Sequence, residues 1–290
     1  MRTVFKKMLR DPIAVVCMGI MCLIILAGIF APLVAPNDPE AVDVILKYAG
    51  PSAQFPLGND YLGRCTLSRL IYGIRTSVLL VLVTMAANVG IGLVLGLIAG
   101  YFRGMVDEIL MRICDIMLSF PTQAMVLAIV GILGVGLDKI LLAVIFFQWP
   151  WYARVFRTSI MKYSDKNYVQ YSKACGFSTP HILFRNVLPA AIPEIVVIGS
   201  NNICSLILNV SGYSFLGLGV QAPKAEWGMM LNETRSVMLT HPEQMMAPGI
   251  AIMIVCVCCS FLGDSLRDAM DAKHVVIRRR RRTGRKAVVS

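Results

Sequence analysis

Residues 76–102 read TSVLLVLVTMAANVGIGLVLGLIAGYF, a stretch without Asp, Glu, Lys or Arg. A helix needs about 20 apolar residues to cross the hydrocarbon core of a bilayer, so this stretch is long enough to span one. The rest of the chain agrees. Of its 290 residues, 57% are hydrophobic and only 16% are charged, whereas soluble domains carry about 25% charged residues. The composition excludes an ordinary soluble domain.

Similar stretches recur on both sides of this one. The runs free of Asp, Glu, Lys and Arg are 12–37, 76–102, 116–137, 195–223 and 244–263. A shorter run, 140–153, lies between Lys139 and Arg154 and contains two tryptophans. We count it as a further span, because an arginine at a helix end can extend to the lipid headgroups. The sequence therefore predicts an all-α integral membrane protein with six transmembrane helices.

The distribution of positive charge predicts how these helices are oriented. The chain has 28 Lys and Arg against 17 Asp and Glu, a formal charge of +11, and cytoplasmic connections of membrane proteins are enriched in Lys and Arg. Here the basic residues gather before the first span, between the fourth and fifth spans and after the sixth, whereas 224–243 is slightly acidic. Both termini are therefore expected in the cytoplasm.

These expectations divide the chain into segments. We predict a cytoplasmic N-terminus at 1–12, a first transmembrane helix at 13–36, an external segment at 37–75, a five-helix transmembrane core at 76–263 and a cytoplasmic basic tail at 264–290. The first helix is interpreted as a retained anchor and not as a secretory signal, because no small-residue cleavage site follows it. The arginine run 278–282 lies just beyond a span, so we interpret it as an anchor on anionic lipid and not as a nucleic-acid site.

The connection 154–189 is the longest one predicted on the cytoplasmic side, and its residues are patterned as two short helices. Gly176 can adopt the left-handed conformation that ends a helix, and Thr179 before Pro180 is typical of the cap of a second helix. Such a helix–turn–helix could be a lid or a docking element. These residues alone leave both interpretations open.

Gly176, followed thirteen residues later by Pro189 after Leu188, resembles the G and LP positions of the EAA loop of bacterial ABC importer permeases. The Glu-Ala-Ala triplet of that family falls on Gln170, Tyr171 and Ser172, and its Ile on Asn186, so the match has departures. In that family the loop sits in a cleft of the ATPase subunit. The resemblance implies an ATPase-coupling loop formed by Gln170, Tyr171, Ser172, Lys173, Ala174, Gly176, Asn186, Leu188 and Pro189.

Four further blocks are similar to the branch of these permeases that serves dipeptides, oligopeptides and nickel. They are 55–70, with Cys65 where the family usually has Asp, 99–121, 214–228 and 263–271. The chain is thereby identified as a member of the ABC importer permeases, with the type I permease fold, a multi-pass protein of the bacterial cytoplasmic membrane. The resemblance implies a second homologous permease subunit, two ATPase subunits and an extracytoplasmic substrate-binding protein as partners.

This chain is not expected to be an enzyme. It lacks the G-x-x-x-x-G-K-[ST] phosphate loop, so ATP and Mg are expected on the partner ATPase subunits, and no cofactor is expected on the chain itself. An alternative, a self-contained secondary transporter, would carry buried ionisable groups and internal repeats. A membrane-embedded enzyme would need a motif such as H-E-x-x-H, which the sequence also lacks.

Polar residues inside the apolar runs are the candidates for a translocation path. Either they replace water around a passing substrate or they form hydrogen bonds between helices, and the sequence leaves both interpretations open. The candidates are Asn88 in the second span and Asn201, Asn202, Ser205, Asn209 and Ser211 in the fifth.

Local motifs favour a metal as the substrate. Residues 149–154 resemble the Trp-x-Trp-Tyr-Ala-Arg string of nickel permeases of the NikC type, and so do residues 222–228, where peptide permeases usually lack the Glu before Trp. We therefore predict import of nickel or a nickel chelate, with a dipeptide or oligopeptide permease as the alternative. His241 is the candidate metal ligand on the external side, although a lone histidine in a loop is usually solvated.

Overall fold

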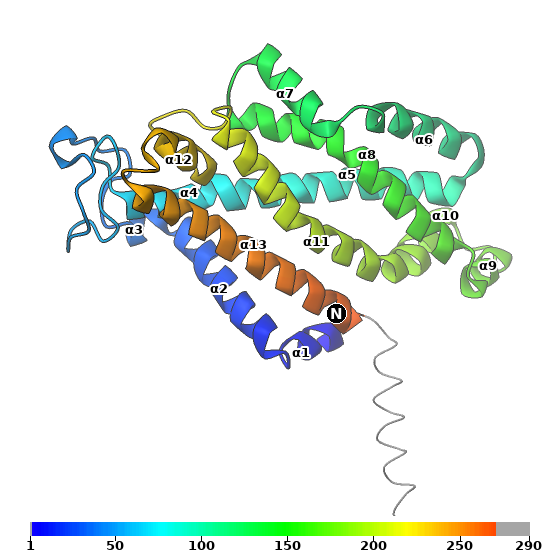
Figure 1. Cartoon of the computed structure of the whole chain (residues 1–290). Coiled ribbons are helices and arrows are strands. Elements are labelled where there is room, and N and C mark those ends of the chain that lie inside the picture. The colour runs from blue at the N-terminus through cyan, green and yellow to red at the C-terminus, as the bar shows by residue number, and fades with distance from the viewer. Residues whose placement is uncertain (1, 271–290) are drawn as a thin grey trace, which may run out of the picture.

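The computed structural model describes residues 2–270; within that range the regular secondary structure is helical, with one isolated bridge between Asn59 and Cys65 in the loops that connect the helices (Figure 1). The arginine run 278–282 and most of the predicted basic tail lie outside the described residues. The longer helices are α2 (Pro12–Ile29), α5 (Leu80–Phe102), α6 (Gly104–Leu118), α7 (Thr122–Leu133), α8 (Leu137–Ser164), α11 (Leu188–Phe215) and α13 (Pro242–Met270). The shorter elements are α1 (Arg2–Met8), α3 (Ala31–Val34), α4 (Thr66–Ile74), α9 (Asn167–Ala174), α10 (Thr179–Ile182), α12 (Trp227–Thr234), the 3-10 turns η1 (Val44–Leu46) and η4 (Arg235–Val237), and the π-helical turns η2 (Arg75–Leu79) and η3 (Leu183–Val187).

Four helical segments within residues 2–270 are long and apolar enough to cross a membrane. They are Pro12–Ile29, Thr66–Phe102, Thr179–Phe215 and Pro242–Met270. Two of them join several elements, because η2 continues α4 into α5 and η3 continues α10 into α11 without a break. α8 is not among the four, since the apolar part of this helix, 140–153, is shorter than about 20 residues.

The predicted span at 116–137 is not one continuous helix. α6 extends to Leu118, α7 begins at Thr122, and the two helices are bent by 75° relative to each other. Pro121 explains the break, because proline lacks the backbone N–H that continues a helix and its ring clashes with the preceding turn. The pair counts as a fifth candidate span only if the bent helices are taken together.

α5 and α8 pack closely along their length. This contact holds α8 in the bundle although α8 is more polar than the other long helices. Gly92, Gly96 and Gly100 recur every four residues on α5 and face α8. A Cβ at Gly96 would lie 2.7 Å from the carbonyl oxygen of Ala153, and one at Gly100 would lie 2.8 Å from that of Arg157. Small residues at this spacing let two helix backbones approach, the usual device for packing helices in a bilayer.

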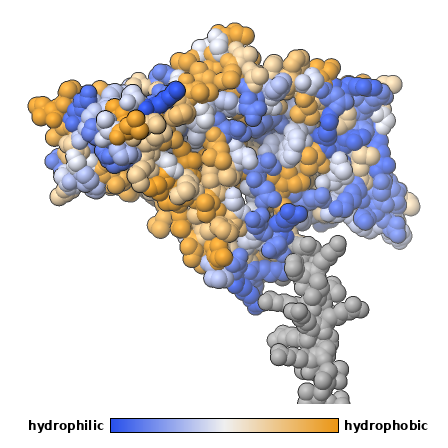
Figure 2. Space-filling view, in the orientation of Figure 1, coloured by the Kyte–Doolittle hydropathy of each residue, from blue (hydrophilic) through white to orange (hydrophobic). Residues whose placement is uncertain are grey.

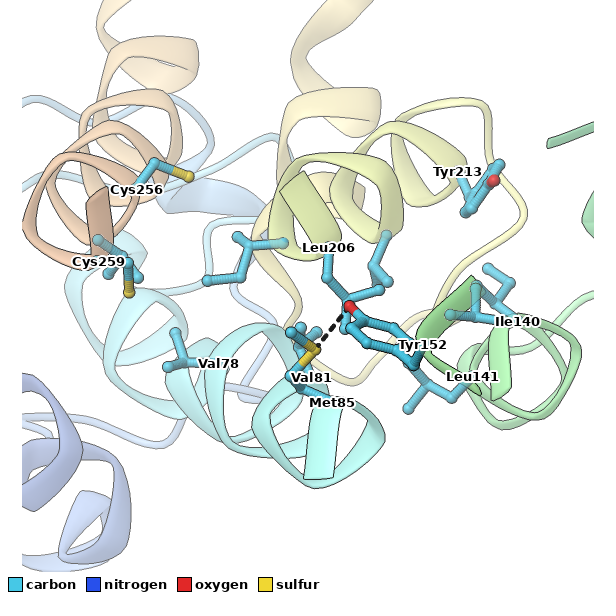
Figure 3. Packing of buried hydrophobic residues seen from close by; sticks show 14 of the residues in the cluster. Val78, Val81, Met85, Ile140, Leu141, Tyr152, Leu206, Tyr213, Cys256 and Cys259 are labelled. Atoms are coloured by element: carbon cyan, nitrogen blue, oxygen red, sulfur yellow. Dashed lines mark hydrogen bonds between the residues drawn. The ribbon is translucent and has the colours of Figure 1, made fainter. Parts of the chain in front are cut away.

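The apolar core joins α5, α8, α11 and α13 (Figure 3). Val78 and Val81 are fully buried, and Tyr152 of α8 donates a hydrogen bond to the sulfur of Met85 at 3.3 Å. Cys256 and Cys259 of α13 are buried on the other side of Leu206. All nine cysteines have free thiols, and six of them are buried. Those six behave as small apolar side chains.

The bundle has two polar ends. Segment 37–65, α12 and the start of α13 gather at one end, which we name the segment end, and α9 and α10 lie at the opposite end, which we name the loop end (Figure 1). Hydrophobic residues cover the outside of α2 and α13 between them (Figure 2). This pattern is expected of a protein whose middle faces lipid.

Candidate functional site

At the loop end, α9 and α10 form the predicted helix–turn–helix. Val169 and Val187 are fully buried and Ile182 is 2% exposed, so these three side chains hold the two short helices on the bundle. Gly176 has a φ of +80°, the left-handed conformation predicted for it. A Cβ at Gly176 would meet nothing within 4 Å, so its backbone angle, not crowding, requires glycine here.

Two details of the prediction at this loop are wrong. Ser178, not Thr179, occupies the N-cap position of α10, and its side chain makes no capping hydrogen bond. The second helix does not end near Pro189 but continues through η3 into α11 as one segment, Thr179–Phe215. The wider π-helical turn just before Pro189 accommodates a residue that cannot donate the regular helical hydrogen bond.

The two polar departures from the EAA pattern contact each other. Asn186 donates from Nδ2 to Oγ of Ser172 at 2.7 Å, so a Ser–Asn hydrogen bond joins the two helices where the family has Ala and Ile. Gln170 donates to the carbonyl oxygen of Ser164 at 3.3 Å. Tyr171, Lys173, Ala174 and Pro189 are exposed or half-buried, and Leu188 is half-buried.

Large aromatic side chains project from this loop. We name Tyr168, Tyr171, Phe177 and Phe184 the aromatic face; their side chains are 46–72% exposed. Phe177 also stacks on His181, with ring centroids 4.7 Å apart. The sequence prediction included Tyr171 but missed Phe177 and Phe184. An exposed group of large apolar residues outside a bilayer face is typical of a protein–protein interface.

Ion pairs near the loop end connect the C-terminal part of α8 to its neighbours. Arg154 and Arg157 of α8 pair with Asp115 and Asp107 of α6, and Arg103 donates to Asp165 at 2.6 Å. These arginines begin the basic stretch that predicted a cytoplasmic connection. Here they also hold α6 on α8, although each exposed pair contributes little stability.

Three of the six path candidates share one face of α11. Asn201, Ser205 and Asn209 are four residues apart, so they form a ridge along the helix. Asn201 and Ser205 are exposed and Asn209 is half-buried. We name these three residues the polar ridge. It presents amide and hydroxyl groups on a side of α11 that the rest of the described chain leaves at least partly open.

The other three candidates point elsewhere. Asn202 donates to the carbonyl oxygen of Ile198 in its own helix at 2.8 Å. Ser211 is buried against Gly228 of α12. Asn88 is fully buried and lies 3.5 Å from the side-chain oxygen of Gln148, a residue that the sequence prediction did not include. Their contacts separate these residues from the ridge, although all of them lie in apolar runs.

A buried ionic cluster lies at the segment end. Arg69 of α4 donates to Asp60 at 2.5 Å and to Glu233 of α12 at 2.7 Å, and Arg64 donates to the same two carboxylates at 2.7 and 3.2 Å. Both arginine side chains are at most 1% exposed. We name these four residues the ionic cluster. It ties residues 60–69 to α12, and the sequence prediction missed it because Glu233 lies 164 residues beyond Arg69.

Helix α4 lacks a side-chain cap at Cys65. This cysteine stands at the N-cap of α4, and its side chain makes no capping hydrogen bond. Asp, which the family usually has at this position, is among the best N-cap residues because its oxygen accepts from the free N–H groups of the first turn. In this chain α4 is held by the ionic cluster without that cap.

A second buried carboxylate fixes the start of α12. Glu226 accepts from the backbone N–H groups of Gly228 and Met229 at 2.9 and 2.8 Å and from Ser77 of η2 at 3.1 Å. Trp227 donates from its ring to the carbonyl oxygen of Leu70 at 2.9 Å. Burial raises the pKa of Glu226, and these hydrogen bonds offset part of that effect.

The turn η2 holds two elements at once. Arg75 donates to the carbonyl oxygens of Gly28 and Ile29 at the end of α2, at 2.7 and 2.8 Å. The next two residues, Thr76 and Ser77, bind the start of α12. A π-helical turn is rare and often marks a functional position. Here it lets consecutive side chains reach two different helices.

His241 lies at the same end. Its ring stacks on Tyr48 with centroids 4.2 Å apart, and Nδ1 is 3.2 Å from a carboxylate oxygen of Glu243. Within residues 2–270, no three His, Cys, Asp or Glu side chains stand close enough together to hold a metal ion. The structure thus gives His241 one carboxylate neighbour.

Two known protein families match the chain. Residues 92–275 match the family of binding-protein-dependent transport system inner membrane components, and residues 1–51 match the N-terminal transmembrane domain of oligopeptide transport permease C. In overall fold the chain is similar to an inward-facing MetNI methionine ABC transporter structure, with a TM-score of 0.55 at 17% identity, covering 70% of this chain and 96% of the other.

Three curated relatives differ in the substrate that their names give. The metal-staphylopine import system permease protein of Staphylococcus aureus (strain NCTC 8325 / PS 47) is 46% identical, with 93% of both chains covered. The nickel transport system permease protein of Escherichia coli (strain K12) is 36% identical over 87% of this chain and 91% of that protein. The dipeptide transport system permease protein of Alkalihalophilus pseudofirmus is 35% identical over 94% of this chain and 90% of that protein.

Proposed function

The chain belongs to the family of binding-protein-dependent transport system inner membrane components and is the permease component of an ABC importer, and we propose that it forms half of a translocation path for a metal. The metal travels as a complex with an organic chelator, and nickel is the first candidate ion. The polar ridge of α11 carries this proposal.

Donor chemistry supports a chelate over a bare ion. Imidazole is a favoured nickel ligand among N, O and S donors, whereas the polar ridge offers only the neutral amides of Asn201 and Asn209 and the hydroxyl of Ser205. Such groups donate and accept hydrogen bonds, and the ridge includes no imidazole or thiolate. They suit a substrate whose metal is already coordinated and whose outer surface carries polar organic groups.

The relatives support the same substrate class. The relative named for metal-staphylopine import is 46% identical, against 36% for the nickel permease and 35% for the dipeptide permease. Peptide import remains the alternative, because a peptide also presents carboxylate and amide groups to such a ridge.

The coupling loop of this proposal is the α9–α10 pair. Its aromatic face docks on a partner ATPase subunit, which binds ATP and Mg, and the short helices transmit the movement of that subunit to α11. The support is the continuity of Thr179–Phe215: the loop and the polar ridge belong to one helical segment. A displacement of α10 therefore moves the ridge as well.

The proposed topology has six spans with both termini in the cytoplasm. α8 is the fourth span in chain order, held against α5 by the glycine contact of that pair, and the loop end is the cytoplasmic end. The extracytoplasmic binding protein delivers substrate at the segment end, and a second permease subunit supplies the other half of the path. Transport then follows alternating access, in which two packed arrangements exchange.

Uptake in cells tests the proposal. Radiolabelled nickel is supplied free or bound to a carboxylate-rich chelator, to cells with and without the chain and its partner subunits, with excess dipeptide as competitor. We expect uptake of the chelated metal to depend on the chain and to ignore peptides. Loss of peptide uptake alone, with metal uptake unchanged, would place the chain in the peptide branch.

A pair of variants locates the path within this assay. Asn209→Leu removes an amide from the polar ridge, whereas Asn202→Leu removes an amide that bonds its own helix. We expect the first to lower uptake about tenfold and the second to leave it nearly unchanged. Equal effects would contradict the assignment of the ridge.

A further inference from the structure

An apolar groove runs between α2 and α13 on the outside of the bundle. It has a volume of about 480 Å³ and is lined by residues 12–20 of α2 and 253–261 of α13. The lining residues follow the same spacing on both helices, and all ten are apolar. Val16 and Met253 are 60% and 58% exposed, so the groove opens outward.

The length of the groove decides what can occupy it. Each wall extends over eight residue steps, or about 12 Å at about 1.5 Å per residue. The hydrocarbon core is about 30 Å thick, so the groove covers about one leaflet. A transmembrane helix of another subunit would need a groove along the whole thickness. A lipid acyl chain needs only one leaflet.

The charge at one end of the groove indicates which lipid. The wall of α2 begins at Pro12, next to Arg10 and the short helix α1. Lys7 donates to the carbonyl oxygen of Ala269 at 2.7 Å, which holds α1 on the end of α13. Lys6 and Arg10 are exposed beside this contact, and neither forms an ion pair within residues 2–270.

α1 also presents apolar groups to its surroundings. Phe5 and Leu9 are 57% and 50% exposed and alternate with Lys6 and Arg10. A short helix with basic and large apolar side chains is typical of a segment that lies in the headgroup layer. Hydrophobic atoms cover the α2 and α13 surface and polar ones lie at its lower end (Figure 2).

We propose that the α2–α13 groove binds an acyl chain of an anionic phospholipid, whose headgroup contacts Lys6 and Arg10. The leaflet is the cytoplasmic one under the proposed topology, and the site is independent of the transported substrate. The bound lipid fills the space between α2 and α13. Two negative residues, Asp264 and Asp268, also lie near the end of α13. The experiment therefore compares an anionic lipid with a zwitterionic one.

Native mass spectrometry of the complete transporter, with its partner subunits and without substrate, measures retained phosphatidylglycerol and phosphatidylcholine. Val16→Trp fills the groove. Leu23→Trp is the matched control, because Leu23 is 70% exposed on α2 beyond the groove. We expect the first variant to lose retained lipid at least fivefold and the second to keep it.

The headgroup contact has its own variants. Removing Lys6 or Arg10 by substitution with Ala is expected to lower the preference for phosphatidylglycerol about fivefold each, since one basic residue near an anionic surface contributes about 1 kcal/mol. Lys47→Ala at the segment end is the control. Equal retention of both lipids, retention that ignores Val16→Trp, or a photo-crosslink from position 16 to the second permease would overturn the proposal. Because substrate is absent, failure of metal uptake would leave these readings unaffected.

Discussion

Different interactions stabilise the two polar ends of the molecule. At the segment end, four buried charged side chains and the buried Glu226 tie segments far apart in the chain into one unit. At the loop end, three buried aliphatic residues and the Ser172–Asn186 hydrogen bond hold two short helices. Breaking a buried ion pair costs far more than breaking one neutral hydrogen bond. We therefore expect the segment end to be the more rigid of the two.

The largest effect is expected from the ionic cluster. Arg69→Met leaves Asp60 and Glu233 buried with a single guanidinium, and such a loss costs about 3–5 kcal/mol. We expect poor yield and a much lower midpoint of thermal unfolding in detergent. Arg185→Met, at an exposed arginine of η3, is the control. A similar midpoint for both variants would show that the segment end is not held by charge.

The second prediction concerns pH and Glu226. Its pKa is raised by burial above 4.5 in the folded state, so the folded state binds the proton more tightly than the unfolded state. Stability is then lost as pH rises from about 4.5 through the folded pKa. Glu226→Gln should remove this dependence, so the difference in stability between the native chain and the variant changes with pH. Unfolding midpoints measured from pH 4.5 to 8 check this, with Glu243→Gln as an exposed control.

The third prediction concerns the turn of the coupling loop. Gly176→Val places a β-branched residue at a φ of +80°, at a local cost of about 1–2 kcal/mol. The protein should insert normally but lose most substrate-stimulated ATPase activity in the reconstituted transporter. Gly131→Val is the control, because it is helical and a Cβ there also meets nothing within 4 Å. Unchanged stimulation in the Gly176 variant would contradict the coupling assignment.

The smallest effect is expected from the Ser172–Asn186 pair. Ser172→Ala and Asn186→Ile should each destabilise the loop by about 0.5–1.5 kcal/mol, since each leaves one polar group without its partner. The double variant carries the residues typical of the family at both positions. Its loss of stability should be smaller than the sum of the losses in the two single variants. A double-mutant cycle on unfolding midpoints measures this coupling. Additive effects would mean that the hydrogen bond contributes nothing.

Sequence patterns predicted the backbone turn at Gly176 but could not sort the path candidates. The left-handed turn at Gly176 could be predicted, because glycine adopts a positive φ far more readily than any residue with a Cβ. The six path candidates could not be sorted, because polarity within an apolar run does not say which way a side chain points. Only the packing of α11 separates Asn209 on the ridge from Asn202, which bonds its own helix.

The sequence by itself determined the class of the molecule: apolar runs without charge require a membrane, and local motifs placed the turn of the loop. Those features depend on neighbouring residues, where backbone geometry and hydropathy act directly. The ionic cluster, the glycine contact of α5 with α8, and the α2–α13 groove were decided by the tertiary structure alone. Each joins residues far apart in the chain, and their energies depend on burial and distance, which no local pattern contains.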